Sequence, residues 1–248
     1  MSTCGIVIPC YNEEQRLTIS LFIEFVRHHE NINFVFVNDG STDNTHDLLM
    51  DMADKFPEKI HIVELKSNSG KAEAIRHGIN YLLKNNESSL VGYWDADLST
   101  PLSEIPRFIN FLKEHQKVLF LMGSRIKRLG ANIKRLEIRH YFGRIFATAV
   151  SIILKLPVYD TQCGAKLIRR KLAEKIFYDQ FISRWLFDVE LIARILAEFG
   201  YSKTIDCIYE LPLETWIDKG DSKVKITDFI RSPYELALIK RQYQNFYD

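Results

Sequence analysis

The stretch VGYWDADLSTP, residues 91–101, joins a short apolar run to two aspartates that are one residue apart. The apolar run has side chains suited to burial on both faces, which is typical of a strand inside a parallel sheet. In open α/β sheets, ligands bind beyond the carboxyl ends of the strands. Asp95 and Asp97 therefore lie where a ligand is expected.

Four similar runs share the length and composition of this strand: CGIVIP (4–9), FVFVN (34–38), IHIVEL (60–65) and VLFLMG (118–123). Amphipathic helical patterns lie between them, at Glu13–Glu30 and around Leu49–Phe56. Strands that alternate with helices predict an α/β fold with a doubly wound, mostly parallel sheet.

The rest of the chain predicts further helices around a less regular second half, which begins at about Leu129. We expect a basic helical stretch over 134–155, a turn at Asp160–Gly164, an apolar helix around 186–199 and a last helix from about Thr227. No internal repeat, low-complexity tract or Pro/Gly-rich linker separates the halves, so one domain over residues 1–248 is expected.

Composition excludes several classes of protein. The net charge is +1, which gives no attraction of the whole chain to nucleic acid. The four cysteines are scattered without CxxC spacing, which favours a reduced cytoplasmic setting. The N-terminus has no signal-peptide pattern. The most apolar stretch, 145–154, is far shorter than the roughly 20 residues that a membrane span needs.

Polar residues follow four consecutive strands, and the residues after three of these strands suggest a role in ligand binding. Asp95 and Asp97 could direct one carboxylate to a ribose or sugar hydroxyl and the other to Mg²⁺ or Mn²⁺; the alternative is a solvated turn that caps a helix. Asp39 lies where a carboxylate could accept the imino N–H of a pyrimidine base. Lys71 begins a helix, a position suited to phosphate or base contacts, or it is simply an exposed lysine.

A local excess of positive charge marks the second half. Between Arg125 and Arg144 the chain has seven basic residues and one acid, a local charge of +6. This stretch is either a solvated basic face or a site for an anionic acceptor at a negatively charged membrane. Its apolar continuation, 146–156, suits either acyl chains or the protein core.

Taken in order, these segments resemble the inverting family 2 glycosyltransferases with the GT-A fold, most closely the dolichyl- or polyprenyl-phosphate β-glucosyltransferase branch. The segments that carry the resemblance are PCYNEE, VNDGSTDNT, NSGKAEAIRHG, DADLSTP, GSR, DTQCGAKLIRR and RWLFDVEL, and they span roughly residues 4 to 225. The resemblance implies a nucleotide-sugar-binding half over about 1–125 and an acceptor-side half over about 126–248.

The resemblance also assigns roles to residues. Donor nucleotide positions are Pro9, Tyr11, Glu13, Asp39 and Lys71, and the D-x-D positions for nucleotide and metal are Asp95 and Asp97, with Mg²⁺ or Mn²⁺ as the cofactor. The donor expected is a UDP-sugar, most simply UDP-glucose, and the acceptor a polyprenyl phosphate or a glycan.

Whether the reaction needs a catalytic base depends on the acceptor, which the sequence does not decide. An alcohol acceptor needs a carboxylate to remove its proton, and the candidates are Asp160 and Asp188. A lipid phosphate is already largely ionised, so positioning by arginine would matter more. The acceptor candidates are Arg125, which is also a catalytic candidate, with Arg139, Arg144, Gln162 and Trp185, and with Glu190 as a supporting residue.

Other functions remain open from the sequence. The runner-up is transfer to a saccharide hydroxyl in surface polysaccharide assembly, and another class is a non-catalytic nucleotide-sugar-binding protein. A dinucleotide-dependent oxidoreductase is disfavoured because no G-x-G-x-x-G follows the first strand. We expect a cytoplasmic protein that contacts the inner face of the membrane peripherally.

Overall fold

The computed structural model describes residues 3–134, 137–220 and 226–243, and the side chains of residues 137–142 and 226–230 lie outside that description. In chain order the elements are β1 (Cys4–Cys10), α1 (Ile19–His28), β2 (Ile32–Asp39), α2 (Thr45–Lys55), β3 (Ile60–Leu65), α3 (Lys71–Asn85), β4 (Leu90–Trp94), α4 (Glu104–Glu114), β5 (Phe120–Ser124), β6 (Asn132–Lys134), α5 (Glu137–Leu154), β7 (Ala165–Arg169), α6 (Arg170–Ile176), α7 (Phe187–Cys207), β8 (Ile208–Pro212), β9 (Thr215–Ile217) and α8 (Ile226–Gln242).

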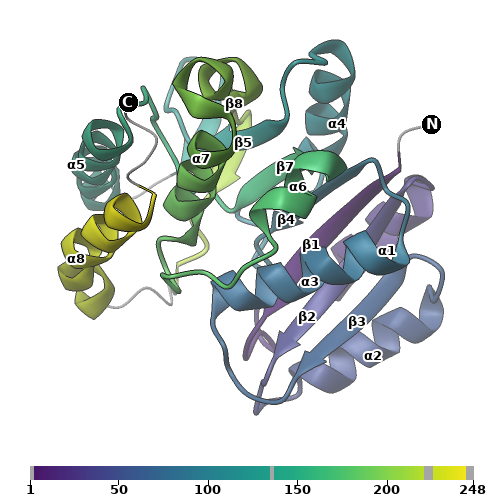
Figure 1. The fold of residues 1–248 in the computed structure, drawn as a ribbon. Helices are drawn as coiled ribbons and strands as arrows, with labels where there is room; N and C mark the ends of the chain where they lie inside the picture. Colours follow the sequence, from purple (N-terminus) through teal and green to yellow (C-terminus); the bar gives the residue numbers. More distant parts are fainter. Residues whose placement is uncertain (1–2, 135–136, 221–225, 244–248) are drawn as a thin grey trace.

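The central sheet has seven strands in the order β3-β2-β1-β4-β7-β5-β8 (Figure 1). Strands β1 to β4 pair in parallel, β7 is antiparallel to both β4 and β5, and β5 pairs in parallel with β8. All five strands expected from the apolar runs are present. The mostly parallel α/β sheet predicted from the sequence is therefore confirmed, with an unpredicted antiparallel strand, β7, inserted between β4 and β5.

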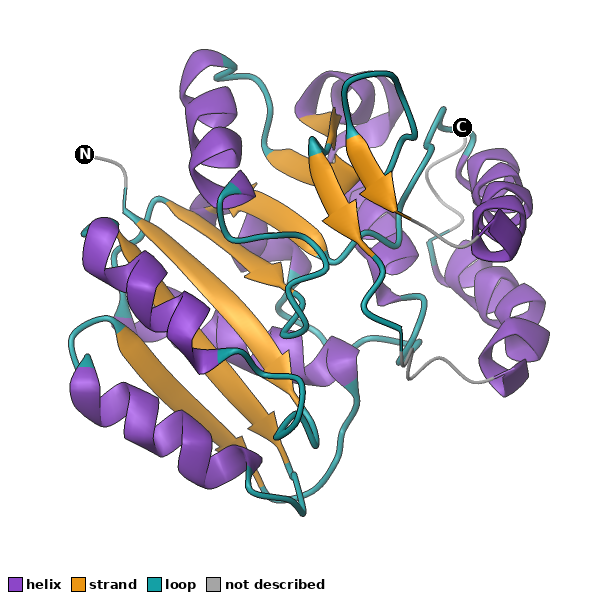
Figure 2. Ribbon diagram, turned by 180° about the vertical axis from the view of Figure 1, so that it is seen from behind, coloured by secondary structure: helices purple, strands orange, loops and turns teal. Residues whose placement is uncertain are grey.

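Helices cover both faces of this sheet (Figures 1 and 2). One face packs on α1, α2 and α4, which contribute Phe22, Met52 and Phe108 to the first core cluster. The other face packs on α3, α6 and α7, which contribute Ile75 and Ile192 among others to the second. Helices α5 and α8 lie beside each other at the β8 side of the molecule. Because both faces are covered, the strands are apolar on both faces, as the sequence indicated.

Helix α1 is shorter than the amphipathic pattern predicted. It begins at Ile19 rather than Glu13, because residues 13–18 form a turn in which the backbone N–H of Leu17 donates to the carbonyl of Glu13 (2.8 Å). The N–H of Glu13 donates to the hydroxyl of Thr45 (2.8 Å). The turn is thus tied to the segment after β2.

The three helices expected in the second half are present, whereas strands β6 to β9 and helix α6 were not predicted. The basic stretch divides into β6, which pairs with β9 in a small second sheet, and α5. The apolar helix is α7, which continues to Cys207 through a non-helical residue at Gly200. Among the described residues, no helix combines the length and the apolar character that crossing a bilayer requires. All four cysteines are buried, and none of them forms a disulfide.

Candidate functional site

The segments that follow β1, β2, β3 and β4 meet at one edge of the sheet. The carboxylate of Asp39, at the end of β2, accepts hydrogen bonds from the backbone N–H of Ser69 (2.7 Å) and of Gly70 (2.8 Å) in the segment after β3. Ahead of α3, Gly70 has φ +93°, a backbone conformation that favours glycine. The convergence that the parallel topology predicted is therefore present.

Asp39 is almost fully buried, at 2% exposure. In addition to the two backbone groups, it accepts the hydroxyl of Ser69 (2.7 Å). These three bonds use most of the acceptor capacity of a carboxylate. The observed contacts make Asp39 the anchor of the segment ahead of Lys71, and its contact with a pyrimidine base stays a prediction.

Asp95 pairs with Lys71 across the edge. The Nζ of Lys71 donates to Oδ1 of Asp95 at 2.5 Å, and about 40% of the lysine side chain is exposed. Burial alone would lower the pKa of Lys71, but the charges of Asp95, Asp188 and Asp97 outweigh that effect and raise the pKa above its ordinary value. Lys71 is thus a permanent cation beside the first aspartate of the D-x-D pair.

The second oxygen of Asp95 rests on the turn at Asp160–Gly164. A Cβ added to Gly164 would lie 1.9 Å from Oδ2 of Asp95. Only glycine leaves room for the carboxylate in this position. The DAD and DTQCG motifs therefore interlock, which explains why a glycine follows Cys163.

Asp97 is held by two groups. Its Oδ2 pairs with Arg16 at 2.9 Å, and its Oδ1 accepts the backbone N–H of Ser99 (2.9 Å). Leu98, which lies between Asp97 and Ser99, has a φ of +52°, so the turn is locally strained. The side chain of Asp97 is 20% exposed, so its carboxylate reaches solvent.

The donor set fits a hard divalent cation. Asp95 and Asp97 present carboxylate oxygens, the ligands that Mg²⁺ and Mn²⁺ favour, with 34% and 20% of their side chains exposed. Within the described residues, no group of three or more His, Cys, Asp or Glu side chains could enclose a metal ion. Two carboxylates suit a cation whose remaining ligands are substrate phosphate oxygens and water.

The remaining donor candidates lie at the end of β1 and in the segment after it. Pro9 lies opposite Val37 in the pairing of β1 with β2, Tyr11 is half-buried, and Glu13 is 7% exposed. Asn12, which the sequence reasoning passed over, accepts the N–H of Thr42 (2.8 Å). These contacts fix the segment against the one after β2.

Arg125 and Asp160 form a bidentate ion pair on the other side of the edge. Nε of Arg125 donates to Oδ2 at 2.7 Å and Nη2 to Oδ1 at 2.6 Å, and the two side chains are only 14% and 8% exposed. Burial alone would lower the pKa of Arg125, but Asp160 outweighs it and raises that pKa above its ordinary value. The guanidinium also lies 5.4 Å from the ring of Trp216. In this structure both carboxylate oxygens of Asp160 are thus hydrogen-bonded to the Arg125 guanidinium.

Asp188 lies in the interior, at 3% exposure. Its Oδ1 accepts the hydroxyl of Tyr93 at 2.5 Å and pairs with Lys166 at 2.7 Å. Burial, and then the charge of Asp188, raise the pKa of Tyr93 well above its ordinary value. This environment suits a supporting residue better than a base that meets an acceptor.

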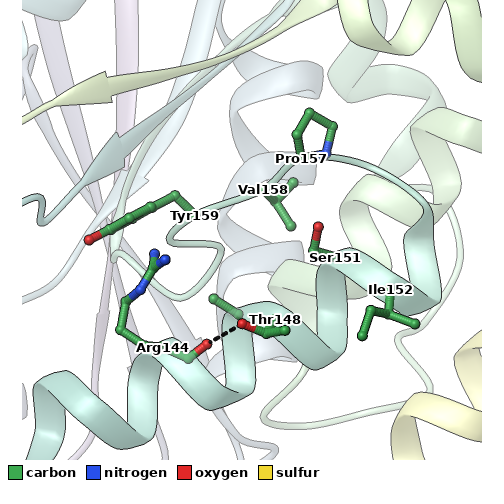
Figure 3. A pocket seen from close by; sticks show the side chains of 8 residues that line it. Arg144, Thr148, Ser151, Ile152, Pro157, Val158 and Tyr159 are labelled. Atoms are coloured by element: carbon green, nitrogen blue, oxygen red, sulfur yellow. Dashed lines mark hydrogen bonds between the residues drawn. The ribbon is translucent and has the colours of Figure 1, made fainter.

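The remaining acceptor candidates lie around α5. Arg144 stacks on the ring of Tyr159 at 3.9 Å, beside a cavity of about 230 Å³ between α5 and residues 157–159 (Figure 3). Trp185 packs against Phe146 of α5, with ring centroids 5.7 Å apart. The side chain of Arg139 lies outside the described residues.

Three buried polar atoms flank the Arg125 pair. Within the described part of the chain, the hydroxyls of Ser124 and Thr161 and the amide nitrogen of Gln162 have no hydrogen-bond partner. Such groups are usually satisfied by water or a ligand. Gln162 is half-buried two positions after Asp160, and its contact with an acceptor stays a prediction.

Three basic residues of the site were missed from the sequence: Arg16, Lys166 and Arg184. Arg184 donates to the side-chain oxygen of Asn68 (2.8 Å) and covers Gly70. Its position next to Trp185 in RWLFDVEL could have signalled it, and Arg16 lies two positions after PCYNEE.

Residues 5–177 match the family described as Glycosyl transferase family 2. A dolichyl-phosphate beta-glucosyltransferase of Trichomonas vaginalis is 33% identical over 94% of this chain and 69% of that protein. The dolichyl-phosphate beta-glucosyltransferases of Saccharomyces cerevisiae and Homo sapiens are 31% and 29% identical over 96% and 93% of this chain, and over 74% and 75% of their own length.

Among solved structures, the chain resembles glucosyl-3-phosphoglycerate synthase from Mycobacterium tuberculosis. In complex with Mn²⁺, uridine-diphosphate-glucose and phosphoglyceric acid, that enzyme gives a TM-score of 0.71 at 15% identity, over 100% of this chain and 81% of that one. At this identity the similarity shows the fold alone.

Proposed function

Because the chain belongs to glycosyltransferase family 2 and has the GT-A fold, we propose that it transfers glucose from UDP-glucose, with inversion, to a polyprenyl or dolichyl phosphate. The observation that carries the proposal is the pair of solvent-reaching carboxylates, Asp95 and Asp97, at the edge where four strands end. The names of the relatives supply the substrate class.

On the donor side, Asp97 and Asp95 would hold Mg²⁺ or Mn²⁺. The bound cation would offset the charge that develops on the departing diphosphate. Lys71, a permanent cation at the start of α3, suits a phosphate or base contact. The nucleotide would lie against the segments that carry Pro9, Tyr11, Glu13 and Asp39.

On the acceptor side, the two candidate bases support a phosphate acceptor over a hydroxyl. Asp160 is engaged in the bidentate pair with Arg125, and Asp188 is buried between Lys166 and Tyr93. Neither carboxylate is placed to take a proton from an alcohol without giving up its partner. A phosphate monoester, with a second pKa of about 6, needs little help from a base.

The acceptor would be oriented by basic and aromatic groups of the second half: Arg125, Arg139, Arg144, Gln162 and Trp185. A peripheral contact with the inner face of the membrane would bring a lipid phosphate there. Leu129 is 100% exposed and directly follows two basic residues, Lys127 and Arg128, which suits insertion among anionic lipids.

We also propose that residues 1–248 work as one unit, with the donor bound by about 1–125 and the acceptor by about 126–248. The continuous sheet supports this arrangement, because β7 of the second half is inserted between β4 and β5.

Transfer of labelled glucose to a short polyprenyl phosphate tests the proposal. UDP-glucose should support transfer, GDP-mannose should not, and EDTA should abolish it. Asp97→Asn should keep the fold and lose about a hundredfold or more in turnover, because it removes a charge aimed at the cation. Equal use of GDP-mannose, or a rate indifferent to EDTA, would refute the donor assignment. Binding of UDP-glucose without transfer to any acceptor would favour a non-catalytic protein.

Arg125→Lys tests the acceptor. Lysine keeps a charge beside Asp160 but lacks the further N–H donors with which the guanidinium can hold Asp160 and a phosphate oxygen at the same time. The acceptor KM should rise about tenfold while the donor KM stays unchanged. Arg125→Ala is a poorer test, because a buried carboxylate left without its partner costs about 3–5 kcal/mol of stability. An unchanged acceptor KM would favour transfer to a saccharide hydroxyl.

A further inference from the structure

Arg16 occupies the carboxylate that the proposed function assigns to the cation. Its Nη2 lies 2.9 Å from Oδ2 of Asp97, and its Nε lies 3.6 Å from Oε2 of Glu13. The arginine belongs to the turn after β1, where its N–H donates to the carbonyl of Glu13 (2.9 Å). The guanidinium therefore spans from the buried Glu13 to Asp97.

A guanidinium and a divalent cation compete for the same oxygen. Oδ1 of Asp97 already accepts the N–H of Ser99, and Oδ2 holds Arg16. The side chains of Arg16 and Asp97 are only 22% and 20% exposed, so their attraction is less screened than that of a surface pair. A cation that approaches Asp97 must displace Arg16 and must also tolerate its charge nearby.

The fixed backbone of the turn that carries Arg16 limits where its displaced guanidinium can lie. The N–H of Glu13 is fixed on Thr45 (2.8 Å), so the turn stays in place while the arginine side chain rotates. Phosphate oxygens bound to a cation on Asp97 would lie within reach of a side chain that already touches that carboxylate. Arginine binds phosphate oxygens with its planar fork as readily as carboxylates.

We propose that Arg16 is a positioning residue that neutralises Asp97 when the cation is absent and transfers to the diphosphate when cation and nucleotide bind. The inference rests on the proposed function, since it needs a cation and a nucleoside diphosphate at this edge. It predicts opposite effects of Arg16 on two ligands: Arg16 opposes binding of the cation alone and favours binding of the nucleotide in the presence of the cation.

The test measures binding, not turnover, on the full chain. Free Mn²⁺ is followed by electron paramagnetic resonance without nucleotide, and UDP affinity by calorimetry at saturating Mn²⁺. Arg16→Gln should bind Mn²⁺ alone about five- to tenfold more tightly, because a unit charge close to the cation is removed. The same variant should bind UDP about tenfold more weakly with Mn²⁺ present.

Two further variants separate charge from structure. Arg16→Lys keeps the charge, so Mn²⁺ binding should match the wild type. Arg27→Gln removes a charge from α1, where the arginine lies over Phe56 (5.9 Å), and should change neither affinity. Unchanged or weaker Mn²⁺ binding by Arg16→Gln, or equal losses for both ligands, would overturn the inference. If the wild type binds no Mn²⁺ even with UDP, the proposed function itself fails.

Discussion

At the scale of single residues, the site depends on close packing between its motifs. One carboxylate oxygen of Asp95 pairs with Lys71, and the other packs against Gly164. This contact sets the direction of the carboxylate, because the interior is packed too densely for a side chain to shift without cost. The glycine of DTQCG thus has a steric role in the D-x-D site.

Gly164→Ala should displace the carboxylate of Asp95 from its observed position. The added Cβ would lie 1.9 Å from Oδ2, so we expect a loss of about 1–3 kcal/mol in unfolding free energy, together with loss of metal-dependent UDP binding. Urea unfolding and calorimetry measure the two effects. Gly130→Ala is the control for UDP binding: its φ of +84° makes alanine costly in stability, but nothing lies within 4 Å of a Cβ there, so UDP binding should stay normal. Normal UDP binding by Gly164→Ala would show that Asp95 does not depend on this contact.

At the scale of elements, the turn at Asp160–Gly164 is held from two sides. Glu210 of β8 accepts the backbone N–H of Tyr159 and of Asp160, each at 2.9 Å. From β7, the buried Nζ of Lys166 donates to the carbonyls of Thr161 (2.9 Å) and Cys163 (2.6 Å). These bonds fix the segment that carries Asp160 and Gln162, so the acceptor candidates are positioned by strands.

Lys166→Met should destabilise the protein by about 3–5 kcal/mol, because it leaves Asp188 buried without its counter-charge. The double variant Lys166→Met/Asp188→Leu should recover part of that loss, since it removes both charges. Urea unfolding measures the free energies. Additive losses in the double variant would mean that the two residues act independently.

At the scale of the whole molecule, one sheet joins the donor and acceptor sides. Strands β1 to β4 lead into the donor segments, and β5, β7 and β8 carry the acceptor side. Arg184, ahead of α7, contacts Asn68 in the donor segment (2.8 Å). Three exposed apolar side chains lie on the surface of the second half: Leu129, which follows the basic Lys127 and Arg128, and Ile145 and Ile152 of α5.

If the loop that carries Leu129 contacts a membrane, its apolar tip and its charges should both matter. Leu129→Ser should lower partition onto vesicles that contain anionic lipid by about tenfold, the effect of withdrawing one leucine side chain from an apolar environment. Raised salt should weaken partition further, because exposed charges are screened. Sedimentation with vesicles measures both. Leu21→Ser on α1, at 46% exposure, is the control. Equal partition of Leu129→Ser and wild type would exclude this loop from the contact.

Sequence alone determined the order of the elements and the edge that carries the site. Runs that are apolar on both faces can be buried only as covered strands, and parallel strands place the residues that follow them at one edge. The positions of Asp39, Lys71, Asp95 and Asp97 follow from that topology. Strand β7 was missed, because Lys166 interrupts its apolar pattern, and burial of this lysine is tolerable only beside Asp188.

Only the tertiary structure decided which charges meet. Arg16 and Asp97 are 81 positions apart, and their pairing depends on the turn that shortens α1. The pairs of Arg125 with Asp160 and of Lys166 with Asp188 likewise join segments whose relative placement no local pattern encodes. Periodicity reports which face of an element is buried, whereas the partner of a charge depends on how separate elements pack.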